Sequence, residues 1–412
     1  MISKRMGSAS SRTEPPVVVT SKIPLFCLKK LGPRHVIVAG GGGESKTGVL
    51  NLMQTYLLTF GNKAVSNCPT PIQAKLVNTI DTDSYATMNM DVICCSNPEK
   101  GRYLIAAGHG QYCDIYETTG YTVGKDDADN EVLSYNICNV GRLTTSEKVE
   151  SFQKCVRFDH STAGKRVVTG GEDGRLRVWN THALVEDRNP ETVRTPILDI
   201  EAHKSDVFDI DISADGRMII SVGYDGIAKM WDMNLGTLIQ EFPFPAECAS
   251  GYKVRSVRCT CLGSGSNLVF VAGYNPVSLS SKRSIASLCI SSCGNFTGVG
   301  TMGGSVLIYD THEMKQCIAF KDTHGIFVTA VEFLDRTSAD VLSLIPQPTS
   351  GNARQVPGPG SCARASIISL SADQTIQVHS LPFDKPSTSL FLIKLFFFSV
   401  VVYYIIWCLS LI

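Results

Sequence analysis

The stretch VAGGGGESKTGVLN, from Val38 to Asn51, comes closer than any other part of this chain to a chemical motif. It nearly matches the phosphate-binding P-loop, a glycine-rich turn that ends in lysine followed by serine or threonine. Gly40 lies six positions before Lys46, and Thr47 follows, but Ser45 stands where the last glycine is expected. In a complete P-loop, backbone N–H groups and the lysine hold the phosphates of a nucleotide.

A P-loop also needs a strand before the glycines and a helix after them. The segment RHVIVAG predicts the strand, but Gly48 follows at once and VLNLMQTYLLTF indicates a second strand. The stretch is therefore expected to be a loop between two strands and not a nucleotide site. From the residues alone it is either a loose hairpin or a functional loop, whose carbonyl groups could bind a hard monovalent cation.

Short apolar runs separated by Gly, Asp and Asn turns recur through residues 15–380 and predict an all-β protein. Two segments set the period, FDHSTAGKRVVTGGEDGRLRVWN and IDISADGRMIISVGYDGIAKMWD. Each contains three expected strands and an Asp-Gly hairpin, and their tryptophans, Trp179 and Trp231, lie 52 residues apart. This spacing is close to the period of a β-propeller blade.

These segments resemble WD repeats, in which a histidine, a Ser or Thr, an aspartate and a tryptophan form hydrogen bonds within one blade. One blade would use His203, Ser221, Asp225 and Trp231, and another would use Thr169, Asp173 and Trp179 without an evident histidine. We expect all seven residues to be structural and none to be a catalyst or a metal ligand.

Weaker copies bring the count to seven blades, one of them truncated, because the chain passes from Tyr274 to Ser284 without room for two more strands. A Pro/Gly/Ser-rich insertion around residues 346–360 splits the last blade. The segment PPVVVTSK is expected to close the ring beside that blade, which removes exposed strand edges. The predicted fold is a seven-bladed WD-repeat β-propeller followed by one transmembrane helix.

The C-terminal stretch LFFFSVVVYYIIWCLSLI, residues 395–412, predicts that helix, because 18 apolar or aromatic residues extend about 27 Å. The apolar character reaches back to Leu390, interrupted by Lys394, which can reach the membrane interface. The expected organisation is a flexible N-terminus at 1–13, a propeller at 14–384, a linker at 385–394 and an anchor at 395–412. Lysines on the N-terminal side place the propeller in the cytosol.

The composition narrows the function. Lys+Arg and Asp+Glu are both 38, so no net charge favours nucleic acid, and no direct nucleic-acid partner is expected. The 15 cysteines include no C-x-x-C pair, which argues against a zinc site, and the N-terminus lacks the apolar region of a signal peptide. We expect reduced thiols in a cytosolic core. The eight histidines are scattered, and His109 is expected to be structural, which argues against an enzyme with a small-molecule substrate.

The glycine loop, the WD repeats and the C-terminal anchor together resemble one family. It is the endoplasmic-reticulum guanine-nucleotide exchange factor that activates the Sar-type small GTPase of the COPII coat, and in animals it includes the prolactin regulatory element-binding protein. The segments DTDSYATMNM, VVTGGEDGRLRVWN, GTMGGSVLIYD and DTHGIFVTAVEFL add to the likeness, which extends from about Pro16 to the C-terminus.

The resemblance implies a loop that projects from the first blade, binds a potassium ion and contacts the GTPase beside its nucleotide site. By this resemblance, the residues expected to bind the cation are Gly40, Gly41, Gly42, Gly43, Glu44 and Ser45. The residues expected to contact the GTPase are Lys46, Thr47, Gly48, Val49 and Asn51. Val49 and Asn51 are expected to loosen GDP, whereas Lys46 either pairs with an acidic partner residue or is a solvated lysine.

Two other functions remain compatible with these features. One is a membrane-tethered WD-repeat scaffold without exchange activity, which the truncated blade favours. The other is a transcriptional regulator, which the absence of a basic cluster and the apolar C-terminus argue against.

Overall fold

The computed structural model describes residues 15–44, 48–60, 72–96, 98–125, 131–146, 151–187, 192, 194–242, 252–261, 268–276, 283–339, 355–383 and 396–404. The chain divides into two units, Met1–Leu381 and Pro382–Ile412.

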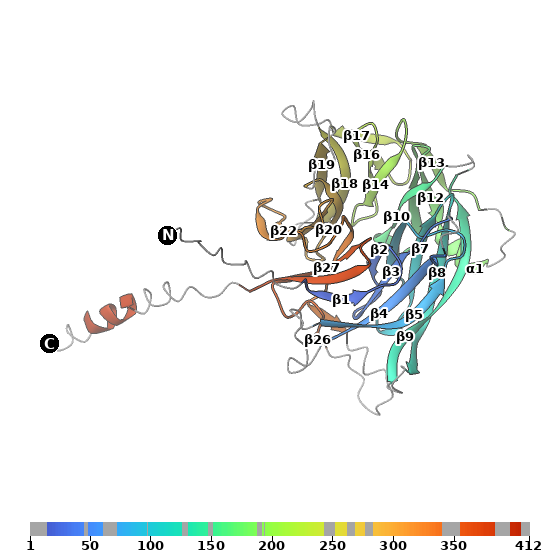
Figure 1. The fold of residues 1–412 in the computed structure, drawn as a ribbon. Helices are drawn as coiled ribbons and strands as arrows, with labels where there is room; N and C mark the ends of the chain where they lie inside the picture. The colour runs from blue at the N-terminus through green and yellow to red at the C-terminus, as the bar shows by residue number, and fades with distance from the viewer. Residues whose placement is uncertain are drawn as a thin grey trace, which may run out of the picture. The chain divides into compact units, whose positions relative to one another are not determined.

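Unit 1 is built from antiparallel sheets that follow one another in chain order (Figure 1). Blade 1 consists of β2 (Leu25–Lys30), β3 (His35–Gly40), β4 (Leu52–Phe60) and β5 (Ile72–Asp81). Blade 2 consists of β6 (Asn89–Cys94), β7 (Tyr103–His109), β8 (Tyr112–Lys125) and β9 (Glu131–Thr144). Blade 3 consists of β10 (Gln153–Phe158), β11 (Arg166–Gly171), β12 (Arg175–Asn180) and β13 (Leu198–Glu201). The 3-10 turns η1 (Pro98–Lys100) and η2 (His160–Thr162) and the helix α1 (Thr181–Glu186) lie in connections.

The second half continues the pattern. Blade 4 consists of β14 (Val207–Ile212), β15 (Met218–Gly223), β16 (Ala228–Asp232) and β17 (Leu238–Phe242). A half-blade follows, made of β18 (Tyr252–Cys261) and β19 (Leu268–Pro276). Blade 5 consists of β20 (Ile285–Ile290), β21 (Phe296–Thr301), β22 (Val306–Asp310) and β23 (Gln316–Phe320). The closing blade contains β24 (Val328–Phe333), β27 (Ala365–Ser371) and β28 (Thr375–Leu381), together with β1 (Val17–Thr20).

The N-terminal strand closes the ring, as the sequence predicts. β1 pairs antiparallel with β28, with Val17 opposite Gln377 and Thr20 opposite Thr375. Figure 1 shows the blue β1 beside the red strands of this blade. The first strands of successive sheets contact each other in the order β2, β6, β10, β14, β18, β20 and β24, and β24 returns to β2. β1 thus supplies the outer strand of the closing blade, and this pairing joins the N-terminal segment to the end of the propeller.

The predicted count of seven blades is wrong for the described part of the chain, which contains six four-stranded blades. The half-blade occupies the position where the sequence predicts the truncated blade. Residues 277–284 are all that lie between the end of β19 and the start of β20. Two more strands of ordinary length, about five to six residues each, do not fit into so short a segment.

The hydrophobic core lies between neighbouring sheets, as expected for blades that are apolar on both faces. The interface between blades 3 and 4, for example, buries Val178, Val207, Ile210 and Trp231. The interface between the half-blade and blade 5 is much smaller, with three buried residues, Val271, Leu288 and Val299. The half-blade therefore obtains little stability from apolar burial on that side.

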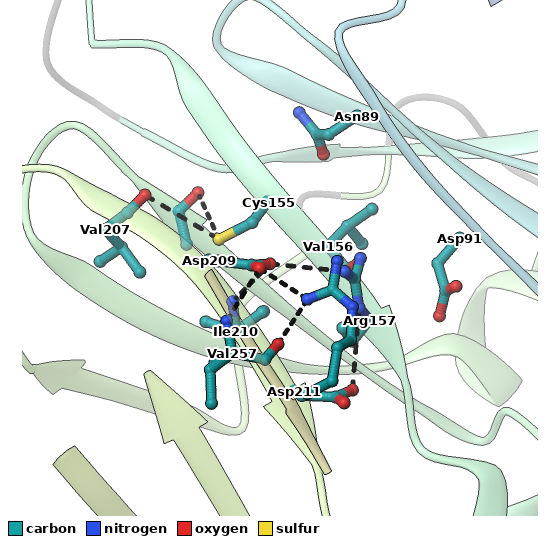
Figure 2. Close-up of polar contacts among 12 residues, drawn as sticks. Asn89, Asp91, Cys155, Val156, Arg157, Val207, Asp209, Ile210, Asp211 and Val257 are labelled. Carbon is teal, nitrogen blue, oxygen red and sulfur yellow. Dashed lines mark hydrogen bonds and ion pairs between the residues drawn. The ribbon is translucent and has the colours of Figure 1, made fainter. Parts of the chain in front are cut away.

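Ion pairs between the first strands link the sheets around the central channel. Arg258 Nη1 of the half-blade lies 2.6 Å from Asp209 Oδ2 of blade 4, and Arg157 Nη2 of blade 3 lies 3.4 Å from Asp209 Oδ1. Figure 2 shows Arg157 extended toward both Asp209 and Asp211. On the other side Lys29 Nζ lies 3.2 Å from Asp91 Oδ1 and 3.7 Å from a carboxylate oxygen of Glu332.

The balance between burial and charge differs among these carboxylates. Burial alone would raise the pKa of Asp91, but Lys29 and Arg157 hold it below its ordinary value. The pKa of Asp211 is raised, because burial outweighs the two neighbouring arginines.

The insertion in the closing blade carries a small sheet of its own. β25 (Thr337–Ala339) pairs antiparallel with β26 (Gln355–Pro357), with Ser338 opposite Val356. The predicted insertion at 346–360 thus overlaps the second of these strands.

In unit 2, residues 396–404 are helical. Among the described residues, no helix is both long enough and apolar enough to cross a membrane. Most of the predicted linker and anchor lies outside the described residues, so the transmembrane helix stays a prediction.

Candidate functional site

The glycine loop, residues 41–51, connects β3 to β4 in blade 1. Among the residues described after the glycines, Gly48–Asn51 lead directly into β4 and form no helix, so the P-loop arrangement of a strand followed by a helix is not seen there, as the sequence predicts. Ser45, Lys46 and Thr47 lie outside the described residues, so their predicted roles stay predictions.

The glycines of the loop are required for two different reasons. A Cβ on Gly40 would lie 1.9 Å from the carbonyl oxygen of Pro24, and one on Gly41 would lie 2.3 Å from Asn51 Oδ1. These two positions are closely packed at the base of the loop. Gly43 and Gly48 have open space around them but take φ of 73° and 79°, a left-handed region that favours glycine.

The side chain of Asn51 is buried at the base of the loop. Its Oδ1 accepts the N–H of Gly43 at 2.9 Å, and its Nδ2 donates to the carbonyl of Gly43 at 3.2 Å and to that of Asp83 at 2.9 Å. The backbone carbonyl of Asn51 accepts the N–H of Thr82 at 3.0 Å. Asn51 therefore joins the loop to the 81–85 turn and does not present its side chain outward.

Leu50 is the apolar side chain that the loop exposes, with 61% of its surface accessible. Its neighbour Val49 is half-buried and packs against the core cluster shared by blade 1 and the closing blade. Sequence reasoning selected Val49 and Asn51 and missed Leu50. No periodicity exists within a loop to reveal which side chain points outward.

Tyr85, in the turn before blade 2, links the glycine loop to that blade. The hydroxyl of Tyr85 donates to Glu44 Oε1 at 3.4 Å, and its ring meets that of Tyr112 edge-on at 5.8 Å. The guanidinium of Arg142 stacks on Tyr112 at 3.6 Å from the ring centroid and is also bidentate to Asp114. These contacts brace one side of the glycine loop.

His109 lies within this neighbourhood but is fully buried. Its Nδ1 is 3.5 Å from Thr87 Oγ1, and burial lowers its pKa. With no exposed face, His109 has the environment of a structural residue.

The WD residues of blade 4 form one connected set. His203 Nδ1 lies 3.0 Å from Asp225, and its Nε2 lies 2.8 Å from Ser221 Oγ, which also accepts Trp231 Nε1–H at 2.9 Å. The strands β14 and β16 of this blade are labelled in the upper part of Figure 1. All four groups are satisfied by one another, which suits a structural role.

In blade 3, Trp179 Nε1–H donates to Thr169 Oγ1 at 2.9 Å, in a pair like that of Trp231 and Ser221. Asp173 is not joined to them, because its carboxylate accepts Arg177 Nη2–H at 2.6 Å and the N–H of Arg175 at 3.2 Å.

The closing blade contains a comparable set that sequence reasoning missed. His324 lies 2.8 Å from Ser369 Oγ and 3.2 Å from Asp373, and His379 takes the place of a tryptophan, 3.1 Å from the same hydroxyl. A search for tryptophans at the blade period passes over this set. In blade 4, His203 precedes Ser221 by 18 residues. In the closing blade, His324 precedes Ser369 by 45 residues, because the insertion lies between them.

Several known proteins are similar to this chain in sequence. A family model described as "WD domain, G-beta repeat" matches residues 146–180 and 194–232, which contain most of blades 3 and 4. Proteins named guanine nucleotide-exchange factor SEC12, from Rattus norvegicus and Mus musculus, are each 26% identical to the chain over 407 residues. The match covers 87% of this chain and 89% of each relative. The chain is similar to the SEC12 exchange factors over most of its length.

A further relative, SEC12-like protein 1 of Arabidopsis thaliana, is 26% identical over 39% of this chain and 35% of its own length. The SEC12 match from rat and mouse extends over most of the chain and so reaches well beyond the two repeats of the family model. The resemblance inferred from the loop and the repeats is therefore confirmed.

Proposed function

We propose that this chain is a guanine-nucleotide exchange factor that activates a Sar-type small GTPase at the endoplasmic reticulum membrane and so starts COPII coat assembly. The observation that carries the proposal is the similarity to the SEC12 exchange factors over 87% of the chain. The braced glycine loop on a rigid blade supports it, because functional loops are commonly held by a rigid scaffold.

Exchange by this route forms no covalent bond. A factor that binds the nucleotide-free GTPase more tightly than the GDP-bound form shifts the population toward release of GDP, and GTP then refills the site. Lys46, Thr47, Gly48, Val49 and Asn51 are the proposed contact segment. To this segment we add Leu50, to which we assign the outward contact because its side chain is exposed. We assign the holding of the loop to Asn51, whose side chain is buried.

A potassium ion is part of the proposal. Backbone carbonyl oxygens are established potassium ligands, and Gly40, Gly41, Gly42 and Gly43 carry such oxygens without side chains to cover them. The carbonyl of Gly43 accepts one hydrogen bond from Asn51 and keeps a second lone pair for a cation. Glu44 and Ser45 complete the proposed ligand segment. If the ion binds, potassium should raise the thermal midpoint of the chain more than sodium does.

The proposed location rests on the C-terminal segment. Residues 395–412, extending back to about 390, would form a single-pass anchor that holds the propeller on the cytosolic side. The apolar sequence, which carries no charged side chain from Leu395 to Ile412, supports this assignment.

The test is release of labelled GDP from a Sar-type GTPase by the full chain in detergent or in vesicles. We expect acceleration over the intrinsic rate, which is lost when residues 46–51 are replaced by Gly and Ser. A matched replacement of residues 312–315, in the turn between β22 and β23, should leave release unchanged. Persistent release from the loop variant would contradict the assignment of the loop.

A second candidate is a membrane-tethered scaffold without exchange activity, favoured by the half-blade and its small interface with blade 5. A folded wild-type chain that leaves GDP release at its intrinsic rate would support this candidate against the first.

A further inference from the structure

The first strands of the sheets place a ring of side chains at one end of the central channel. Six of them, all except β6, shift register near their start, after the first residue in five strands and after the third residue, Val254, in β18. The bulged residues, which all line a cavity of about 170 Å³, are Phe26, Lys154, Phe208, Arg255, Ala286 and Thr329. This end is the face of the glycine loop, because Leu25 at the start of β2 lies opposite Gly40.

Two of these bulged residues begin a stacked series of cations and rings. The guanidinium carbon of Arg255 lies 5.1 Å from the ring centroid of Phe208, and that ring meets Tyr224 at 5.9 Å. Lys253 Nζ lies 4.0 Å above the ring of Tyr224. We call Phe208, Tyr224, Lys253 and Arg255 the aromatic–cation patch. Cation–π contacts hold the rings and the charges in fixed positions.

The patch is exposed and its charges are not neutralised. Tyr224 is 56% accessible, and the adjacent Tyr252 is 45% accessible. No carboxylate of the described residues lies within ion-pair distance of Lys253 or Arg255. By contrast, Lys154 at the same channel end pairs with Glu172, and the deeper Arg258 pairs with Asp209. Tyrosine and arginine are enriched among the residues that dominate protein–protein binding.

The position of the patch relates it to the glycine loop. Blade 4 lies three positions from blade 1 in one direction around the ring. The half-blade lies three positions from blade 1 in the other direction. The patch and the loop therefore stand on opposite sides of the channel end. A protein that sits over the channel would face both.

We propose that the aromatic–cation patch docks an acidic segment of the same GTPase whose nucleotide site the glycine loop opens. The inference rests on the proposed function. Charge complementarity selects the segment, since two fixed cations without carboxylate partners attract an acidic surface. The loop supplies the exchange step, whereas the patch supplies affinity and faster association.

The experiment measures GDP release from a Sar-type GTPase against the concentration of the full chain. For the double variant Lys253→Glu with Arg255→Glu, the half-saturating concentration should rise roughly tenfold or more while the maximal rate stays unchanged. The matched control, Lys165→Glu with Arg217→Glu, reverses two exposed charges in the turns at the other end of the sheets and should behave as wild type. The variant Arg255→Lys, which keeps the charge, should retain most of the wild-type affinity.

Salt supplies a second readout. At fixed potassium, choline chloride should raise the half-saturating concentration of wild type and have little further effect on the double variant. Equal half-saturating concentrations for the double variant and its control would overturn the docking inference while leaving the proposed function intact. If wild type does not accelerate release, the proposed function fails. Direct binding of the GTPase then decides the inference, which is overturned if the double variant binds as well as wild type.

A lipid alternative gives a different pattern. Phosphatidylserine vesicles that bind wild type and not the double variant, with GTPase half-saturation in solution unchanged, would assign the patch to a membrane surface and overturn the proposal.

Discussion

The side chain of Asn51 forms a closed pair with the backbone of Gly43, accepting its N–H at 2.9 Å and donating to its carbonyl at 3.2 Å. One side chain thus fixes the first part of the glycine loop relative to the start of β4. The third hydrogen bond, to the carbonyl of Asp83, connects the loop and the start of β4 to the turn before blade 2. The loop is held from its base, which leaves its outer part available for contact.

Replacing Asn51 with Ala should disorder the loop, because all three of these bonds are lost and three backbone groups lose their partners. We expect a loss of stability of about 1–3 kcal/mol and a fall in GDP release of tenfold or more. Thermal unfolding and the release assay measure the two effects. A matched control is Asn78→Ala in β5, which removes one bond to the carbonyl of Tyr135 at 3.1 Å. Asn78→Ala should lower stability and leave GDP release unchanged. Equal GDP release by Asn51→Ala and Asn78→Ala would contradict the proposed role of Asn51 in holding the loop.

Leu50→Ser tests the outward contact of the loop. Because Leu50 is mostly exposed, the substitution should change the free energy of unfolding by less than about 0.5 kcal/mol. If the exposed leucine enters an apolar site on the GTPase, the release rate should fall several-fold. Val49→Ala is the comparison, since this half-buried residue should lose up to about 1 kcal/mol of stability. Wild-type release by Leu50→Ser at all concentrations would remove Leu50 from the contact.

Some of these features follow from the sequence, and others depend on the folded chain. Strand repeats, the ring closure by β1 and the pairing of Trp231 with Ser221 follow from local pattern and fixed spacing. The burial of Asn51 and the exposure of Leu50 do not, because a loop has no period. The ion pairs between sheets are also hidden, since Asp209 and Arg258 meet only when the sheets assemble.

The blade count shows a related limit. The sequence locates the short segment between Tyr274 and Ser284, but the number of complete blades depends on which strands find partners. The set around His324 is missed because His379 stands where a tryptophan is expected and an insertion separates the residues.

Asp209 should be the residue on which the attachment of the half-blade depends most. Its carboxylate accepts bonds from Arg258 at 2.6 Å, Arg157 at 3.4 Å and the N–H of Val257 at 3.2 Å. Asp209→Ala leaves two largely buried arginines without this partner, and such a change costs on the order of 3–5 kcal/mol. Hydrogen exchange should show β18 and β19 losing protection before the other strands, because the apolar interface with blade 5 is small.

Asp215→Ala is the control for this prediction, since Asp215 lies in the exposed turn after β14 and pairs weakly with Arg217 at 3.9 Å. It should leave the exchange of β18 and β19 unchanged. Uniform loss of protection across all blades in Asp209→Ala would argue that the ion pairs of Asp209 stabilise the whole propeller and not the half-blade in particular.

The closing blade should make the protein sensitive to acid. Ser369 has one proton to share between two imidazoles. Asp373 accepts the Nδ1–H of His324, so Ser369 donates to Nε2 of His324 and accepts Nε2–H from His379. The Nδ1 of His379 then remains a bare acceptor, and no described group pairs with it. Burial and the neighbouring His324 lower the pKa of His379 to about 3.

The direction of the pH effect follows from that lowered pKa. The unfolded chain takes up a proton at His379 near pH 6.5, but the folded chain resists it down to about pH 3. Between these values the unfolded state binds more protons, so stability falls as the pH falls and is constant above about pH 7. The loss from this group should be roughly 2 kcal/mol at pH 5. His35, whose pKa burial lowers to about 4, should add to the effect in the same window.

His379→Phe removes the titrating group and should reduce the drop in thermal midpoint between pH 7 and pH 5, although the absolute stability at pH 7 falls because Ser369 loses a donor. His182→Phe is the control, because His182 is about half exposed and its loss should leave the pH slope as in wild type. If the thermal midpoints of His379→Phe and wild type fall by the same number of degrees between pH 7 and pH 5, the acid sensitivity arises from another residue. The buried His35 is then the next position to substitute, because its ring Nδ1 also has no partner among the described groups.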